Sequence, residues 1–424
     1  MPDFHQNGDI ATLHDLDQNG LDRLENEIEE HARTQPIALV LPALFSEFQG
    51  EALHRIRAEL ARVSYLRQIV LVLGDADPDQ FQEARRYFRP LNQQVTILWI
   101  SGERIQRLFD LLETNNLFTG EDGKGRSCWL AYGYILASGL SSLIVQHDCD
   151  ILSYNRRLLA RLCYAVANPD LGFEFCKGYY ARVTDRLHGR VTRLFLTPLL
   201  RTLIGLFPAQ PFLQYLASFR YALAGEFAMR ASLARSVRIP CDWGLEVGLL
   251  AEIYRSRSIT RVCQADLALN YEHKHQILSE DDPTRGLTRM ASDIAKTLFR
   301  TLAAEGIVFT EGVFRTLEVR YVRIAEDTIT RYYADARFNG LAFDRHLEEQ
   351  AVAAFARSVR LAAQCYLEDP LGKPLIPNWN RVVSAIPDFY AQLLDAVRAD
   401  NAARVLYAIA GGSRSRVLVA SSAQ

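Results

Sequence analysis

The sequence lacks the features typical of secreted, membrane-spanning and nucleic-acid-binding proteins. Its seven cysteines are an odd number without a C-x-x-C pair, which argues against a disulfide framework or a zinc cluster and favours free thiols in a reducing cytoplasm. The start, MPDFHQNGDI, lacks the basic and apolar regions of a signal peptide. No apolar run approaches the ~18 residues that span a bilayer. The formal net charge of −2 offers no basic excess to bind nucleic acid.

The bulk composition is that of an ordinary globular protein. Hydrophobic residues make up 49% and charged residues 23% of the 424 positions, so the chain can bury a large core. This length favours two domains, or one large domain with an extension. The most apolar stretch, 194–224, is interrupted by charged, proline and amide residues such as Arg201 and Pro208. We interpret it as buried or dimer-forming helices, so a homodimer is expected, with a membrane-surface patch as the alternative.

The middle of the chain alternates strand and helix patterns. Short apolar runs at 36–42, 69–74, 95–100 and 143–146 predict strands buried on both faces, and 51–63, 81–87 and 128–138 predict the intervening helices. This alternation indicates an α/β fold with a mostly parallel sheet. Leucine spacing in 10–34 predicts short amphipathic helices. Beyond residue 280, helices are predicted at 287–305, 312–333, 346–367 and 384–399, with a loop at 371–379 and a loose Gly- and Ser-rich tail from 411.

An acidic pair follows the fourth predicted strand. Asp148 and Asp150 are two residues apart after the run 143–146, so both carboxylates can point to the same face at the carboxyl edge of the sheet. A hard divalent cation such as Mg²⁺ or Mn²⁺ takes such ligands together with a diphosphate. Upstream, the Gly123-Lys124-Gly125 triplet opens a predicted helix, where a lysine can reach a phosphate or a base carbonyl. Each motif alone also occurs in turns or on solvated surfaces, but together they predict a nucleotide-sugar site.

Seven motifs, in this order, resemble those of glucosyl-3-phosphoglycerate synthases. They are Pro42-Ala-Leu, Gly123-Lys-Gly, Asp148-Cys-Asp, His188-Gly-Arg-Val-Thr-Arg, Gly225-Glu, Trp243-Gly-Leu-Glu-Val-Gly-Leu-Leu and Glu272-His. Members of that family are retaining GT-A glycosyltransferases. The resemblance implies a Rossmann-like GT-A domain at 36–280, preceded by a helical segment at 1–35 and followed by a helical C-terminal region at 281–410 and a flexible tail at 411–424.

The resemblance also implies a role for individual residues. The nucleotide sugar would contact Pro42, Ala43, Leu44, Phe45, Ser46, Asp75, Lys124, Asp148, Cys149, Trp243, Gly244, Leu245 and Glu246. Where the family often has acidic or amide residues, this chain has Phe45 and Ser46, so Glu47 is an alternative contact for the ribose. Glu246, Asp150 and Lys124 are the predicted catalytic residues, with Glu246 placed to orient the sugar hydroxyls.

The acceptor and the metal ion have their own implied ligands. Gly189, Arg190, Val191 and Thr192 would bind the phosphate and carboxylate of the acceptor, because a guanidinium matches phosphate oxygens bidentately. His275 stands where the family has a polar acceptor-binding residue. The resemblance assigns Mg²⁺ or Mn²⁺ to Asp150 and His273. A ligating histidine must be neutral, so activity should fall below about pH 6.5.

These roles imply transfer of glucose, with retention of configuration, from UDP-glucose or another nucleotide-glucose to 3-phosphoglycerate. Among related reactions, a GDP-sugar donor, mannose transfer or unphosphorylated glycerate remain alternatives. In a different class, a sugar nucleotidyltransferase would need a basic loop after the first strand, whereas residues 42–47 contain no basic residue. A non-catalytic nucleotide-sugar-binding protein is the third possibility. No catalytic base stands out, and the resemblance implies that the leaving phosphate takes the acceptor's proton.

Overall fold

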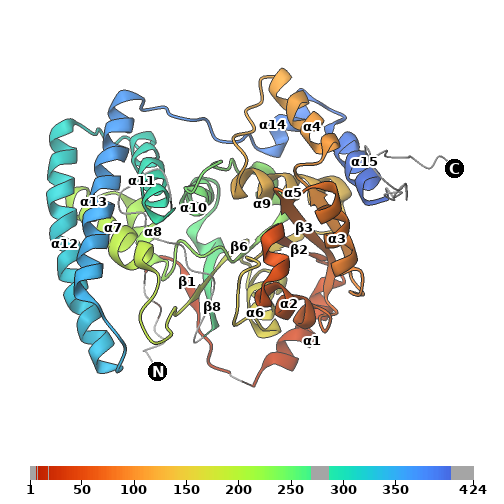
Figure 1. The fold of residues 1–424 in the computed structure, drawn as a ribbon, viewed down its shortest axis with the longest axis horizontal. Coiled ribbons are helices and arrows are strands. Elements are labelled where there is room, and N and C mark those ends of the chain that lie inside the picture. Colours follow the sequence, from red (N-terminus) through yellow and green to blue (C-terminus); the bar gives the residue numbers. More distant parts are fainter. Residues whose placement is uncertain (1–5, 7, 18, 269–285, 403–424) are drawn as a thin grey trace, which may run out of the picture.

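The computed structural model describes residues 6, 8–17, 19–268 and 286–402. Its centre is a single mixed β-sheet (Figure 1). Within these residues the sheet has 8 strands in the order β1-β8-β6-β7-β5-β2-β3-β4. The strands are β1 Ala11–Leu13, β2 Ile37–Leu44, β3 Leu66–Gly74, β4 Gln94–Trp99, β5 Leu143–Gln146, β6 Phe175–Tyr180, β7 Phe227–Arg230 and β8 Val262–Ala268. Only β7 runs antiparallel to its two neighbours, β5 and β6. The predicted α/β class with a mostly parallel sheet is therefore confirmed.

Alternating side chains of the central strands build two cores. In β2, Ala38 and Val40 belong to one buried cluster, whereas Ile37, Leu39 and Leu41 belong to the other. Strands that are buried on both faces need apolar residues at nearly every position, which explains the continuous apolar runs in the sequence.

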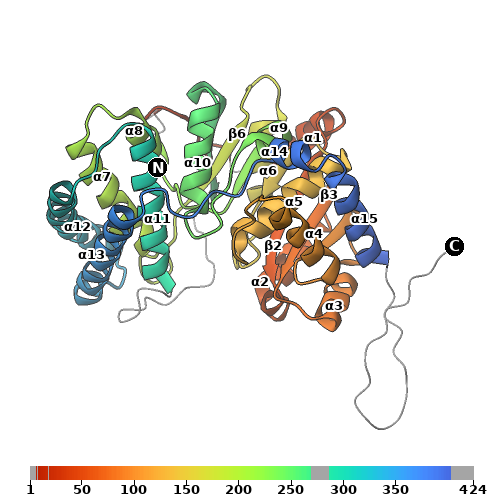
Figure 2. The same ribbon diagram turned by 90° about the horizontal axis from the view of Figure 1, so that it is seen from above.

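Helices cover both faces of the sheet and extend it at both ends (Figure 2). They are α1 Leu21–Ala32, α2 Glu51–Leu60, α3 Pro78–Phe88, α4 Glu103–Thr114, α5 Lys124–Ser138, α6 Arg156–Ala167, α7 Thr197–Leu206, α8 Pro211–Ser218, α9 Ala231–Ser236, α10 Leu245–Ser256, α11 Gly286–Ala304, α12 Glu311–Phe338, α13 Arg345–Glu368, α14 Trp379–Ala385 and α15 Phe389–Ala402. Helices α11 to α13 pack together beside α7 at one end of the molecule, and α15 packs against α4 and α5 at the other.

The C-terminal segment crosses from one end of the molecule to the other (Figure 1). After α13 it returns to the sheet, where the Trp379 indole stacks on that of Trp129 with ring centroids 4.2 Å apart. Trp129 Nε1 donates to Pro377 O at 2.8 Å, and Trp379 Nε1 donates to Trp129 O at 3.2 Å. Because α11 to α13 and α14 to α15 contribute to the same buried cluster, the C-terminal helices share a core with the sheet.

The structure differs from the sequence-based expectation in several places, among them the helix expected at 384–399, which is divided because α14 ends at Ala385 and α15 begins at Phe389. Residues 10–34 were expected to be helical, but Ala11–Leu13 form the edge strand β1, which pairs with β8. With 3 residues, β1 is too short to show the alternation of apolar and polar side chains that indicates a strand, and the surrounding leucines have helical spacing. Strands β6 to β8 were not predicted. The expected tail, 411–424, lies outside the described residues.

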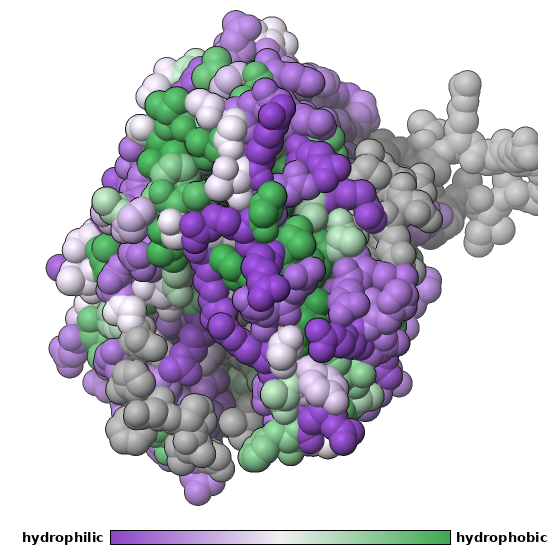
Figure 3. All heavy atoms as spheres, turned by 90° about the vertical axis from the view of Figure 1, so that its left-hand side faces the viewer, coloured by the Kyte–Doolittle hydropathy of each residue, from purple (hydrophilic) through white to green (hydrophobic). Residues whose placement is uncertain are grey.

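The apolar stretch 194–224 is explained by the packing of a single chain. Its large residues, including Leu194, Phe195, Leu203, Phe212 and Leu216, are buried in the cluster that joins the sheet to the C-terminal helices. Its apolar character therefore gives no support to the predicted dimer. In the described part of the chain, no helix is long and apolar enough to cross a membrane. Figure 3 views the α12–α13 end, where hydrophilic side chains alternate with smaller hydrophobic patches.

Candidate active site

A cavity of about 610 Å³ opens at the carboxyl edge of the sheet. It lies beyond the end of β5, where Asp148 and Asp150 follow the strand, and it is closed by the start of α5, the loop before α10 and the first residues of α11. Open α/β sheets bind their ligands at this edge, near the point where chain connections diverge to either side. Here the connections diverge between β2 and β5, since β3 and β4 lie on one side and β7 and β6 on the other.

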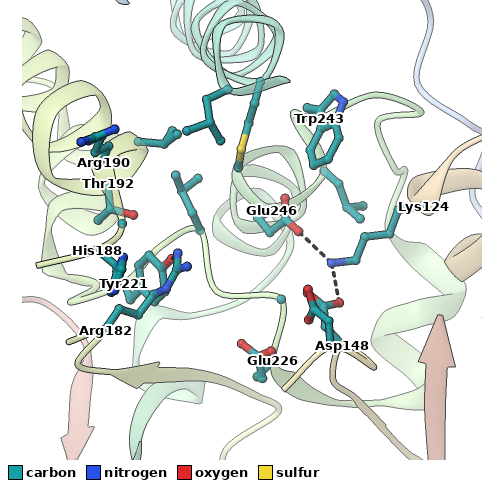
Figure 4. A pocket seen from close by; sticks show the side chains of 18 of the residues that line it. Lys124, Asp148, Arg182, His188, Arg190, Thr192, Tyr221, Glu226, Trp243 and Glu246 are labelled. Atoms are coloured by element: carbon teal, nitrogen blue, oxygen red, sulfur yellow. Dashed lines mark hydrogen bonds and ion pairs between the residues drawn. The ribbon is translucent and has the colours of Figure 1, made fainter. Parts of the chain in front are cut away.

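One side of the cavity, which we call the acidic wall, carries Lys124, Asp148, Glu226 and Glu246 (Figure 4). Asp150 also lines the cavity and is close enough to Asp148, Lys124 and Glu226 to feel their charges, so we count it with this wall. Lys124 is the first residue of α5, and its Nζ lies 2.7 Å from Asp148 Oδ1 and 3.5 Å from Glu246 Oε1. Burial alone would lower the pKa of Lys124, but the carboxylates of Asp148 and Glu246 raise it well above its ordinary value. The lysine is therefore a fixed positive charge between two carboxylates.

Asp150 is held in a strongly electronegative environment. Burial, followed by the charge of Asp148, raises the pKa of Asp150 to about 7, although Lys124 opposes the shift. The negative charges around Asp150 therefore exceed the positive charge of Lys124, so an added cation would be attracted here. Carboxylate oxygens are also the ligand type that Mg²⁺ and Mn²⁺ prefer. The acidic wall fits a hard divalent cation. Among the described residues no set of three His, Cys, Asp or Glu side chains completes such a site, and the predicted ligand His273 lies outside them, as does His275.

A second layer of polar groups lies beneath the acidic wall. The side chain of Lys177 on β6 is buried, and within the described residues its Nζ has no hydrogen-bond partner. Burial lowers its pKa to about 8, while Glu246 and Glu226 oppose this shift. Glu226 accepts a hydrogen bond of 2.7 Å from the Tyr180 hydroxyl. This buried lysine adds positive charge behind the carboxylates.

Gly225 lets the backbone approach the acidic pair. A Cβ atom at this position would lie 2.5 Å from Asp148 Oδ2, closer than real contacts allow. Any side chain at Gly225 would force the Asp148 carboxylate to shift from the position in which it contacts Lys124. The Gly225-Glu226 motif therefore has a geometric role.

The opposite side of the cavity, which we call the basic wall, carries Arg182, His188, Arg190, Thr192 and Tyr221 (Figure 4). Arg182 Nη1 donates to the Tyr221 hydroxyl at 3.2 Å, and His188 Nε2 lies 2.7 Å from Thr184 Oγ1. Gly189 has a φ of 73°, a left-handed conformation that glycine adopts without strain, and it turns the chain into the π-helical segment Val191–Leu196. Local π-helical geometry is frequent at functional sites.

The structure brings many of the predicted site residues together. Those that line the cavity are Lys124, Asp148, Asp150, Gly189, Arg190, Val191, Thr192, Trp243, Leu245 and Glu246. Those outside its lining are Pro42, Ala43, Leu44, Phe45, Ser46, Asp75, Cys149 and Gly244. The Cys149 side chain is buried in the core, so only its backbone can face a ligand.

The residues after β2 and β3 form a neighbouring edge. Leu44 pairs with Gly74, so Phe45 and Ser46 lie next to Asp75. His147 N donates to Val40 O at 3.4 Å, so the chain leaves β5 beside the middle of β2, and β2 continues past it to Leu44. This edge is continuous with the acidic wall and is where a nucleoside could extend from the cavity.

Sequence reasoning missed Lys177, Arg182, Tyr221 and Glu348. Lys177 interrupts the apolar pattern of β6, and this is one reason why the strand was not predicted. Glu348 reaches the basic wall from α13, and its partner Arg190 is 158 positions away in the sequence. Such a long-range contact leaves no local pattern.

Comparison with known proteins identifies close relatives over nearly the whole chain. The chain is 47% identical to a glucosyl-3-phosphoglycerate synthase of Persephonella marina over 95% of this chain and 99% of the relative. It is 40% identical to one from Methanococcoides burtonii over 94% of this chain and 98% of the relative. No protein-family model matches the chain.

Solved structures of lower identity share the fold. A glucosyl-3-phosphoglycerate synthase from Mycobacterium tuberculosis in complex with Mn²⁺, UDP-glucose and phosphoglyceric acid has a TM-score of 0.52 at 20% identity, covering 69% of this chain and 88% of its own. A mannosyl-3-phosphoglycerate synthase from Rubrobacter xylanophilus has a TM-score of 0.51 at 22% identity, covering 67% and 80%. At these identities the likeness shows a common fold alone.

Proposed function

Because the chain belongs to the glucosyl-3-phosphoglycerate synthases, which are glycosyltransferases, we propose that it transfers glucose from UDP-glucose to 3-phosphoglycerate with the help of Mg²⁺ or Mn²⁺. The observation that carries this proposal is one cavity with two walls of opposite character. The acidic wall suits a metal-bound diphosphate. The basic wall suits an acceptor that has both a phosphate and a carboxylate.

The donor would lie along the acidic wall and the neighbouring edge of the sheet. When bound, a divalent cation would neutralise charge on the leaving diphosphate as a Lewis acid. Asp150, and His273 as the second proposed ligand, would hold that cation. Lys124 would exchange part of its pairing with Asp148 for a phosphate oxygen, which keeps positive charge where the leaving group becomes negative. Residues 42–46 and Asp75 would contact the nucleoside.

Glu246 would orient the glucose. Its carboxylate is largely buried beside Lys124 and lines the cavity, so it can accept hydrogen bonds from sugar hydroxyls without competition from bulk water. Trp243, at the same end of the cavity, offers an apolar face to the sugar ring. Positioning and charge neutralisation would then account for most of the rate increase, with the anomeric configuration retained.

The acceptor would lie against the basic wall. Arg190 can present two amino groups to phosphate or carboxylate oxygens, and Thr192 adds a hydroxyl donor. Hydrogen bonds between charged groups each contribute about 1.5–3 kcal/mol. Their loss would therefore reduce the affinity for an acceptor with both a phosphate and a carboxylate more than that for unphosphorylated glycerate.

Three features of the whole chain belong to the same proposal. We place the catalytic domain at 36–280, preceded by 1–35, which adds the edge strand β1 and helix α1, and followed by the helical region 281–410. All seven cysteines are free, which fits a reducing cytoplasm. The homodimer is retained as a prediction to be tested by solution mass measurement.

A grid of donors and acceptors tests the proposed function. Nucleotide release would be measured for UDP-glucose, GDP-glucose and GDP-mannose, each with 3-phosphoglycerate, glycerate or no acceptor, in Mg²⁺ or Mn²⁺. We expect the highest rate for UDP-glucose with 3-phosphoglycerate, and NMR of the product should show a retained anomeric configuration. Equal rates with and without an acceptor, or a clear preference for glycerate, would contradict the proposal.

A further inference from the structure

The loop that carries the basic wall is fixed to the C-terminal helices. Ala342, in the turn between α12 and α13, donates its backbone N–H to Asp185 O at 2.8 Å and forms a β-bridge with Arg186. The following π-helical segment, Val191–Leu196, packs against α11, α12 and α13, and the Tyr321 hydroxyl donates to Leu194 O at 2.9 Å. The C-terminal region therefore holds the acceptor side of the cavity in place.

Glu348 on α13 connects this support to a side chain of the basic wall. Its Oε1 accepts from Arg190 Nε at 3.0 Å, and its Oε2 accepts from Arg193 Nη1 at 2.8 Å. The Glu348 side chain is only 6% exposed. A buried carboxylate is stable only when it is paired, so Glu348 and the two arginines act as one unit.

The two arginines of this unit do different things. Arg193 is buried, donates to His188 O at 2.8 Å, and lies over the Tyr332 ring at 4.8 Å from its centroid, so it neutralises Glu348 within the core. Arg190 lines the cavity, and its side chain is 34% exposed. Its bond to Glu348 runs through Nε, which leaves the Nη amino groups for a ligand. Glu348 thus restricts the rotation of the guanidinium that is proposed to bind the acceptor.

We propose that Glu348 is a positioning residue for the acceptor, which acts by pre-orienting Arg190 toward the phosphate or carboxylate of 3-phosphoglycerate. This inference rests on the proposed function. It gives the C-terminal helices an indirect part in acceptor binding, since α13 supplies the carboxylate that holds Arg190. A guanidinium held in its bound orientation loses less conformational freedom when the ligand arrives, and this increases affinity.

The test is the variant Glu348→Gln. The amide is uncharged, so its oxygen would hold the Arg190 guanidinium less strongly, and its NH₂ group would face an arginine donor in place of a carboxylate oxygen. We expect the KM for 3-phosphoglycerate to rise roughly tenfold, while the KM for UDP-glucose and the kcat at saturating acceptor stay within about twofold. A merely structural role would lower the melting temperature and the active fraction without this separation of the two KM values.

Glu349→Gln is the matched control. Glu349 is the next residue on α13, but it forms an exposed i,i+4 pair with Arg345, so its substitution should leave both KM values unchanged. Glu348→Asp covers the case in which the glutamine variant does not fold. It keeps the negative charge but draws the carboxylate back from both arginines by one methylene, so Arg190 loses its close contact and the acceptor KM should still rise several-fold.

The outcomes separate the two proposals. If the wild-type chain does not release UDP in response to 3-phosphoglycerate, the proposed function fails. If the wild type is active but folded Glu348→Gln or Glu348→Asp protein has the wild-type KM for 3-phosphoglycerate, the positioning role of Glu348 is overturned and the proposed function stands.

Discussion

At the scale of single residues, the ammonium group of Lys124 joins the carboxylates of the acidic wall. Its contacts of 2.7 Å to Asp148 and 3.5 Å to Glu246 hold both side chains before any substrate binds. Without Lys124 these carboxylates would repel each other and the leaving diphosphate. The lysine therefore links the structure of the acidic wall to its proposed chemistry.

Replacing Lys124 with methionine removes this charge but keeps most of the side-chain volume. We expect kcat/KM to fall by on the order of 10²–10³, since a fixed positive group at the leaving phosphates is lost. UDP release at saturating 3-phosphoglycerate measures the effect. Lys373→Met is the control, because Lys373 is an exposed lysine paired with Glu121 on the surface. Similar losses in the two variants would contradict the role given to Lys124.

His147 makes stability depend on pH. It is buried at the end of β5, its Nδ1 lies 2.9 Å from Asp148 O, and burial lowers its pKa to about 4. The folded protein thus binds fewer protons at this site than the unfolded chain, whose histidine has a pKa near 6.5. The stabilisation is complete above about pH 6.5 and is lost as the pH falls toward 4, by on the order of 3 kcal/mol.

We expect His147→Asn to flatten the pH dependence of the unfolding free energy between about pH 4 and 6.5. The asparagine amide can replace Nδ1 as a donor to Asp148 O, so the fold should persist. Denaturant unfolding at several pH values would measure the slope, and His346→Asn, at an exposed position on α13, is the control. If the His147 variant keeps the wild-type slope, another group controls stability in this range.

At the scale of secondary-structure elements, the sequence predicted the central strands and the acidic pair but not the whole sheet. The apolar run of β5 leads directly to Asp148 and Asp150, so the strand and the acidic pair could be read from consecutive residues. Lys124 at the start of α5 was equally local. These features were predictable because short-range patterns determine them.

The remaining elements depend on contacts that are distant in the sequence. Strand β6 contains Lys177 and Gly178, which weaken an apolar pattern, and their burial follows from pairing with β7 and β8. Likewise, Glu348 looks like a helix-surface residue in the sequence, and its role depends on the position of α13 beside the basic wall. A single sequence carries no local signal for either pairing.

At the scale of the whole molecule, the C-terminal segment joins both ends of the fold. Helices α11 to α13 support the basic wall, whereas α14 packs against α9 and α15 packs against α4, α5 and β4. The contact between Trp129 and Trp379 depends on Gly133 in α5, since a Cβ there would lie 2.0 Å from Trp379 Cζ2. The segment that follows α13 can therefore pack against α5 here because α5 has a glycine at this position.

Gly133→Ala tests that dependence. We expect it to destabilise the protein by about 1–3 kcal/mol, because the Trp379 indole must move in a packed core. Gly312→Ala is the control: the nearest atom to a Cβ there is 3.8 Å away, and Gly312 lies in the first turn of α12, so the change should be neutral or slightly stabilising. Equal thermal stability of both variants would show that the segment can repack without cost.

The proposed glucose transfer depends on a divalent cation that Asp150 would help to hold. The most direct measurement is the rate of UDP release from UDP-glucose with 3-phosphoglycerate, for the wild type and for Asp150→Asn, with Mg²⁺ or Mn²⁺ and with excess chelator. We predict a wild-type rate that chelator abolishes and a folded variant slower by about 10³-fold or more. A variant that keeps a rate within tenfold of the wild type, or a wild type that is insensitive to chelator, would contradict the account.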